Sequence, residues 1–184
     1  MRILALSGSL RLDSYNTRLL LAATELARAG VEVELYDGLA ALPPYDTDAD
    51  IRPAPAAVRD LRARIAAADA VLIATPEYNG SVPGVLKNAL DWASRPFPES
   101  SLRNKPVAIM GASTGSYGAM WAQTDLRRVL GVAGARVVGD ELPVARAAEQ
   151  FDAEGRLTDP ELQARLAAQV ELLAAEAQGV LAAA

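Results

Sequence analysis

Cysteine and histidine are both missing from this chain of 184 residues. Without cysteine there can be no disulfide and no thiolate nucleophile, and without either residue no Cys/His metal site. The missing histidine also removes the most common general base. Any reaction must therefore rest on carboxylates, hydroxyls, Arg, Lys, Tyr, backbone amides, or a cofactor that brings its own chemistry.

Long apolar runs and blocks of one charge are missing as well. No apolar run approaches the roughly 20 residues that a membrane helix needs, and the run at the N-terminus is too short for a signal-peptide core. The 18 basic and 23 acidic residues give a formal net charge of −5, without the positive stripe that nucleic-acid binding requires. We expect a soluble, cytoplasmic protein that binds neither nucleic acid nor membrane.

What the chain does contain is a regular alternation of strand and helix patterns. Its length and its apolar fraction of 51% suit a single domain over residues 1–184. The expected strands are residues 2–7, 31–36, 70–74, 107–111 and 135–138, and the expected helices begin near residues 14, 58, 83, 118 and 160. Residues 37–55, which include four prolines, are expected to form a long surface connection.

Strands that alternate with helices predict an α/β protein, with a five-stranded parallel sheet between two layers of helices. The common strand order for such a sheet is 2-1-3-4-5, and ligands bind beyond the carboxyl ends of the strands, at the switch point between strands one and three. The loops richest in Gly, Ser, Thr and Asn follow strands one, three and four. These strands are neighbours in that order, so the three loops should converge on one site.

Loop one, residues 7–16, leads into the N-terminus of a helix. The hydroxyls of Ser9 and Ser14, the Asn16 amide, the Arg11 guanidinium and the free helix N–H groups could together surround a phosphate dianion. Alternatively, Ser14 is only the helix N-cap and the loop glycine only a turn. The loop lacks the dinucleotide and P-loop fingerprints, which favours a monophosphate.

Loop two, residues 76–83, follows a continuously apolar strand and suits a flat heteroaromatic ring. Gly80 would let the backbone approach the ring edge, and Tyr78 would cover a face or a wall. Alternatively, the two prolines only punctuate a turn and Tyr78 is a surface aromatic. Glu77 could serve as a catalytic acid, but a structural role is favoured because carboxylates are more often solvated or paired.

Loop three, Gly111–Gly115, matches the G-x-S-x-G nucleophile elbow and lies between a strand and a helix, as that motif requires. A serine elbow needs a general base, almost always histidine, and this chain has none. We therefore interpret loop three and the residue after it as a second polar wall of the ligand site. That wall consists of Ser113, Thr114, Gly115 and Ser116.

Three large side chains, Tyr117, Met120 and Trp121, begin the helix that follows loop three. Large apolar side chains are usually buried, so we expect these to belong to the core. The alternative is an exposed apolar rim where a second ligand enters the site.

Three motifs together resemble the NADPH-dependent FMN reductase family over nearly the whole chain. They are Gly8–Arg11 with Ser14 and Asn16, then Pro76–Gly80 continuing to Lys87–Trp92, and finally Gly111–Gly115. The second motif is highly specific, whereas the other two would be weak alone. The family is flavodoxin-like and binds FMN non-covalently. It includes reductases of free flavin, quinones, azo dyes and chromate, usually as homodimers or homotetramers.

The resemblance implies a role for each matching residue. The FMN phosphate would be held by Ser9, Arg11, Ser14, Tyr15 and Asn16. The isoalloxazine ring would be held on one side by Pro76, Glu77, Tyr78, Asn79 and Gly80, and on its other side by Ser113, Thr114, Gly115 and Ser116. It also implies NADPH or NADH as co-substrate, with no metal and no catalytic side chain. One departure from the family pattern falls at Thr124 and Asp125, where many relatives would have an aromatic residue and a histidine.

Two functions remain open on the sequence. The first is an oxidoreductase that passes hydride from NAD(P)H through bound FMN to a free flavin, quinone, azo compound or metal oxyanion, in a ping-pong course. The flavin stores the electrons, so such an enzyme needs no histidine base. The second is a flavodoxin-like electron carrier or flavin-binding sensor without steady-state reductase activity.

Overall fold

Strands and helices alternate through most of the chain, for which a computed structural model describes residues 1–51 and 53–183. The strands are β1 (Arg2–Ser7), β2 (Glu32–Tyr36), β3 (Ala70–Ala74), β4 (Pro106–Ala112), β5 (Arg136–Val137) and β6 (Leu142–Val144). The helices are α1 (Tyr15–Leu26), α2 (Ala56–Ala67), α3 (Gly84–Ala93), α4 (Met120–Val132), α5 (Ala147–Gln150) and α6 (Pro160–Ala183), with a 3-10 helix η1 (Gly38–Ala41).

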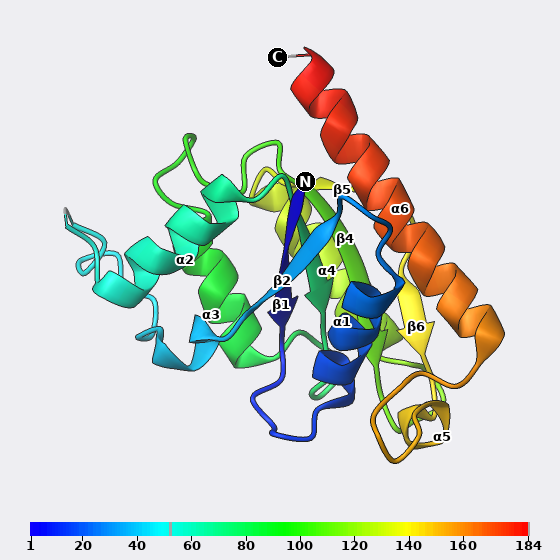
Figure 1. The fold of residues 1–184 in the computed structure, drawn as a ribbon. Coiled ribbons are helices and arrows are strands. Elements are labelled where there is room, and N and C mark those ends of the chain that lie inside the picture. The colour runs from blue at the N-terminus through cyan, green and yellow to red at the C-terminus, as the bar shows by residue number, and fades with distance from the viewer. Residues whose placement is uncertain (52, 184) are drawn as a thin grey trace.

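The strands form one parallel sheet in the order β2-β1-β3-β4-β5, with helices on both faces (Figure 1). The predicted order and the predicted three layers are therefore confirmed, and the fold is flavodoxin-like. β3 has its predicted bounds because an unbroken apolar run of five residues, Ala70–Ala74, is buried on both faces of the sheet.

Beside β4, the structure differs from the prediction of a single fifth strand. β5 is two residues long and pairs with the start of β4, whereas β6 pairs with the end of β4. Between them the chain turns at Gly139, which has a φ of +67°. Gln169 of α6 fills this break by donating from Nε2 to the carbonyl oxygen of Ile109, at 2.8 Å. β6 tolerates Pro143 because it is an edge strand.

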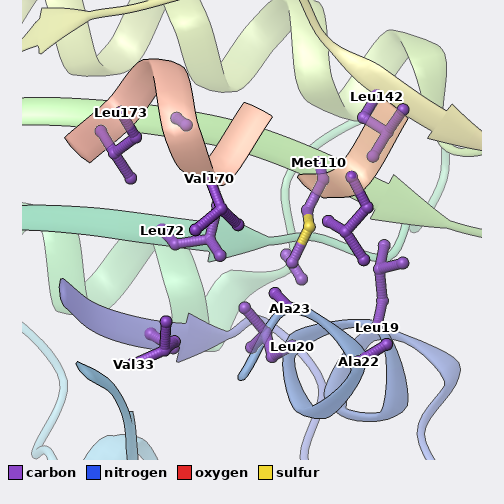
Figure 2. Packing of buried hydrophobic residues seen from close by; sticks show 14 of the residues in the cluster. Leu19, Leu20, Ala22, Ala23, Val33, Leu72, Met110, Leu142, Val170 and Leu173 are labelled. Carbon is purple, nitrogen blue, oxygen red and sulfur yellow. The ribbon is translucent and has the colours of Figure 1, made fainter. Parts of the chain in front are cut away.

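Two apolar clusters hold the layers together, one on each face of the sheet. Successive residues of β1 point to opposite faces, so that Ile3 belongs to one cluster and Leu4 to the other. Figure 2 shows the cluster between the sheet and the helices α1 and α6, where Leu20, Leu72 and Val170 meet. None of the helices that the structure describes, α6 included, has the length and apolarity to cross a membrane.

The proline-rich connection after β2 is partly buried, so the expectation of a surface connection is wrong for three of its residues, Leu39, Leu42 and Ala54. Leu39 and Leu42 are 3% and 8% exposed and pack into the cluster on the face covered by α2 and α3. Trp92 of α3 ties the connection down by donating from its indole nitrogen to the carbonyl oxygen of Pro43, at 2.8 Å. The segment therefore closes one side of the core.

Candidate functional site

The three polar loops meet at the carboxyl ends of β1, β3 and β4, around a cavity of about 170 Å³. The residues that line it are Ser9, Arg11, Ser14, Tyr15, Asn16, Pro76, Glu77, Tyr78, Ala112, Ser113 and Thr114. The sequence did not predict Ala112, the last residue of β4. Four predicted residues, Asn79, Gly80, Gly115 and Ser116, do not line the cavity.

Position and chemistry, rather than size, single out this cavity. A hollow beside α1 reaches about 310 Å³ but lies away from the loops that follow β1, β3 and β4. The smaller cavity lies at the switch point between β1 and β3, where ligands bind in sheets of this order. The predicted convergence of the three loops is therefore confirmed.

Loop one brings two buried hydroxyls to the cavity. Ser14 is 3% exposed and is the N-cap of α1, since its Oγ accepts a hydrogen bond from the Thr17 N–H at 3.4 Å. Ser9 is 8% exposed, and its Oγ accepts from the Arg11 N–H at 3.4 Å. Ser14 is thus both a helix cap and part of the cavity wall, and its predicted contact with a phosphate stays a prediction.

Unused donors gather at the start of α1. Within the described residues, the backbone N–H groups of Tyr15 and Asn16 have no acceptor, as is usual in the first turn of a helix. The exposed guanidinium of Arg11 likewise forms no ion pair with the part of the chain that the structure describes. A cation, two free N–H groups at a helix N-terminus and two hydroxyls are the chemistry that holds a phosphate dianion.

The Asn16 side chain is committed mainly to the protein itself. It is 3% exposed, its Nδ2 donates to the carbonyl oxygen of Ala112 at 3.0 Å, and its Oδ1 accepts from the Ala112 N–H at 2.9 Å. This pair of bonds fastens the start of α1 to the end of β4. One Nδ2 hydrogen is left for a ligand, so the phosphate contact predicted for Asn16 stays a prediction.

The tip of loop two is a tight turn with left-handed backbone. Tyr78 and Ser81 exchange backbone hydrogen bonds of 3.1 and 3.2 Å, while Asn79 and Gly80 between them have φ values of +53° and +75°. This is the type I′ geometry that the sequence Asn-Gly favours. Neither residue's N–H has an acceptor among the described residues. The turn therefore presents two free amide donors, beside a Tyr78 side chain that is 51% exposed.

Two carboxylates connect loop two and α4. The Ser81 hydroxyl donates to Oδ2 of Asp125 at 2.6 Å, and the Ala122 N–H donates to Oε2 of Glu77 at 3.1 Å. The hydrogen bond from the Ser81 hydroxyl is the main cause that keeps the pKa of Asp125 below its usual value, and the hydrogen bond from the Arg128 guanidinium is the second. Asp125 thus anchors the loop, and Glu77 has the structural role expected of it.

Replacement of Glu77 by alanine should destabilise the fold by about 1 kcal/mol, because Glu77 accepts an otherwise free N–H in the first turn of α4. Urea unfolding would measure the loss. Glu99→Ala is the matched control, since the exposed Glu99 has no hydrogen bond or ion pair within the described chain, and should change stability little. Equal stability of the two variants would show that the cap contributes nothing.

Loop three is held in place by β6 and α5, two short elements that the sequence did not predict. The Ser113 N–H donates to the carbonyl oxygen of Val144 in β6 at 3.1 Å, and the Ala147 N–H of α5 donates to that of Ser113 at 3.0 Å. The Ser113 hydroxyl accepts from the Gly115 N–H at 3.1 Å. With no histidine in the chain, Ser113 lacks the base of a nucleophile elbow and serves as a polar wall of the cavity.

The expectation that Tyr117, Met120 and Trp121 are core residues is wrong. They are 59%, 46% and 53% exposed, and the rings of Tyr117 and Trp121 lie 4.9 Å apart. They occupy the outer side of the first turn of α4 and the residues before it, whereas Ala122 and Gln123 are the buried residues of that turn. They form the exposed apolar rim of the alternative, and the entry of a second ligand there stays a prediction.

Comparison with known proteins agrees with this geometry. A model of the NADPH-dependent FMN reductase family matches residues 1–149. An NAD(P)H-dependent FMN reductase of Pseudomonas aeruginosa is 43% identical over 173 residues, which cover 94% of this chain and 92% of that protein. A 2-hydroxy-1,4-benzoquinone reductase of Burkholderia sp is 46% identical over 129 residues, covering 70% and 69%. The solved structure of FerB, a flavoenzyme NAD(P)H:(acceptor) oxidoreductase of Paracoccus denitrificans, superposes with a TM-score of 0.85 at 37% identity, covering 95% of this chain and 98% of that one.

The strand order, the cavity at the switch point and the donors of loop one define a flavodoxin-like nucleotide-binding protein. Within that class, the chain belongs to the NADPH-dependent FMN reductase family. It is therefore an oxidoreductase that uses FMN and NAD(P)H. The residues present fit FMN, because Arg11 and the free N–H groups of α1 suit its phosphate and the free amides of the loop two turn suit a heteroaromatic edge.

Proposed function

We propose that this protein oxidises NAD(P)H and reduces a small acceptor, with a quinone as the first candidate among free flavins, quinones, azo compounds and metal oxyanions. The quinone comes first because the Burkholderia relative is a quinone reductase by name. The observation that carries the proposal is a phosphate-type donor set at the switch-point cavity, whose wall also includes Tyr78, the residue just before the two free amides of the loop two turn. Bound FMN would supply the redox chemistry for which the chain has no side chain.

We assign the binding of FMN to the protein's own groups as follows. Loop one would hold the phosphate through Arg11, the hydroxyls of Ser9 and Ser14 and the first N–H groups of α1. The turn of loop two would bond the ring edge, and loop three would wall the other side of the ring. The exposed rim of Tyr117 and Trp121 would shield the acceptor from water, since flat aromatic side chains cover flat ligands well.

The test of the proposal is the steady-state consumption of NADPH with 1,4-benzoquinone as acceptor. Sustained turnover, many cycles per protein molecule, is expected for the enzyme. An electron carrier or flavin-binding sensor would consume almost no NADPH under the same conditions. The assay without quinone is the control, because it measures the slow reaction with oxygen alone.

Turnover should follow a ping-pong course, since NADPH and quinone would use the same exposed face of a ring that is walled on its other side. Initial rates measured over a grid of both concentrations should then give parallel lines in double-reciprocal plots. Lines that intersect would indicate a ternary complex, and would contradict the shared face.

We also propose a homodimer or homotetramer. Supporting it, apolar side chains are exposed together at the start of α4, including Tyr117 at 59% and Trp121 at 53%, whose rings lie 4.9 Å apart. Large exposed apolar residues that lie near one another often mark an interface. Sedimentation equilibrium would determine the assembly, and a monomer would refute this part of the proposal.

A further inference from the structure

The side chain of Gln123 is completely buried beneath the entry to α4, at 0% exposure. Its Nε2 donates to the carbonyl oxygen of Gly118 at 2.8 Å. Gly118 and Ala119, the two residues before α4, have left-handed φ values of +58° and +60°. Such backbone persists only where surrounding contacts hold it, and in an alanine it is strained. Gln123 provides one of these contacts.

The same amide lies against the ends of two strands. A Cβ atom placed on Gly111 of β4 would come within 2.9 Å of the Gln123 Nε2 and 2.7 Å of the carbonyl oxygen of Thr75, which follows β3. Glycine at position 111 therefore makes room for the amide. Gln123 thus stands where the end of β3, the end of β4 and the connection to α4 come together, behind the wall of the cavity.

The other half of the amide is left without a partner. Oε1 of Gln123 is buried and accepts no hydrogen bond within the described residues. A buried unpaired oxygen destabilises a fold, and a methionine of similar length would avoid that cost. The amide is therefore explained by the bond of its nitrogen to Gly118 rather than by a general gain in stability.

We infer that Gln123 is a positioning residue for FMN. By holding the Gly118 carbonyl, Gln123 fixes the left-handed backbone at the entry to α4. That backbone in turn positions loop three, which precedes it, and the rim formed by Tyr117 and Trp121. The inference rests on the proposed function, in which loop three walls the isoalloxazine ring. Gln123 itself does not line the cavity and acts through this backbone.

The chain offers a closely matched control in Gln169. This glutamine is also buried, at 8% exposure, its Nε2 donates to the carbonyl oxygens of Ile109 and Asp140, and its Oε1 is likewise unpaired. It fills the break between β5 and β6 and does not line the cavity. Gln123→Met therefore removes one side-chain-to-backbone bond behind the FMN site, and Gln169→Met removes two bonds of the same kind away from it.

The experiment compares thermal melting with calorimetric titration of FMN and of riboflavin for both variants and the wild type. Melting should show that both variants are folded. Only Gln123→Met should bind FMN at least tenfold more weakly, and riboflavin by the same factor, because loop three faces the ring and not the phosphate. A general loss of rigidity would instead weaken flavin binding in both variants. It would also change the ratio of the affinities for FMN and riboflavin.

Three results would overturn the inference: wild-type FMN affinity in Gln123→Met, an equal loss in Gln169→Met, or a loss for FMN without one for riboflavin. If Gln123→Met does not fold, Gln123→Asn replaces it, because the shorter amide cannot reach Gly118 and should weaken both flavins equally. Failure of the wild type to bind FMN would instead refute the proposed function, so the two failures are distinguishable.

Discussion

Gly80→Val is expected to fold and to lose most of its FMN. Gly80 is the second central residue of the type I′ turn in loop two, with a φ of +75°. A Cβ atom there would meet nothing within 4 Å, so the cost is backbone strain rather than a clash, on the order of 1–2 kcal/mol. The exposed turn can relieve that strain by changing shape, and the amides proposed to bond the ring edge would then move.

Gly30→Val is the control for this prediction. Gly30 also has a left-handed φ, +87°, and open space around its Cα, but it lies in the turn before β2, at the opposite edge of the sheet from the cavity. Circular dichroism, thermal melting and FMN content should show two folded variants, of which only Gly80→Val lacks flavin. A folded Gly80→Val with wild-type FMN content would show that loop two does not hold the ring.

Arg11→Gln should weaken FMN by about ten- to a hundredfold, or about 1.5–3 kcal/mol, the contribution of a hydrogen bond to a charged group. Arg11 is the cation among the residues that line the cavity, and it has no ion-pair partner in the described chain. Its loss should spare the affinity for riboflavin, which has no phosphate, and should leave thermal stability nearly unchanged.

The control for Arg11 is Arg103→Gln, because Arg103 is exposed, lies outside the cavity and has no hydrogen bond from its side chain within the described residues. It should bind FMN as the wild type does. An unchanged dissociation constant in Arg11→Gln would place this guanidinium in solvent, and a loss shared by both variants would indicate only a general effect of charge.

Much of the fold could be predicted because its signals are local. The apolar run Ala70–Ala74 reads as a buried strand, and Ser14 before an amphipathic pattern reads as a helix cap, as observed. The place of the site follows from one further rule, that the carboxyl ends of neighbouring parallel strands share an edge. This rule was sufficient to predict that Ser9 and Ser113 line the same cavity.

The remainder depends on contacts between distant parts of the chain. β6 is three residues long and contains a proline, so its pairing with β4 leaves little local pattern. The bonds between Asn16 and Ala112, 96 residues apart, and between Ser81 and Asp125 are tertiary. The exposure of Trp121 likewise depends on which side of α4 faces the sheet, and residue type alone predicted the wrong side.

The central claim is that loop one recognises the phosphate of a flavin mononucleotide in the cavity at the switch point. Calorimetric titration of the purified apoprotein with FMN and with riboflavin tests it most directly. We expect one FMN per chain, bound more tightly than riboflavin by at least the tenfold that Arg11 alone should contribute. Equal affinities for the two flavins would contradict the account.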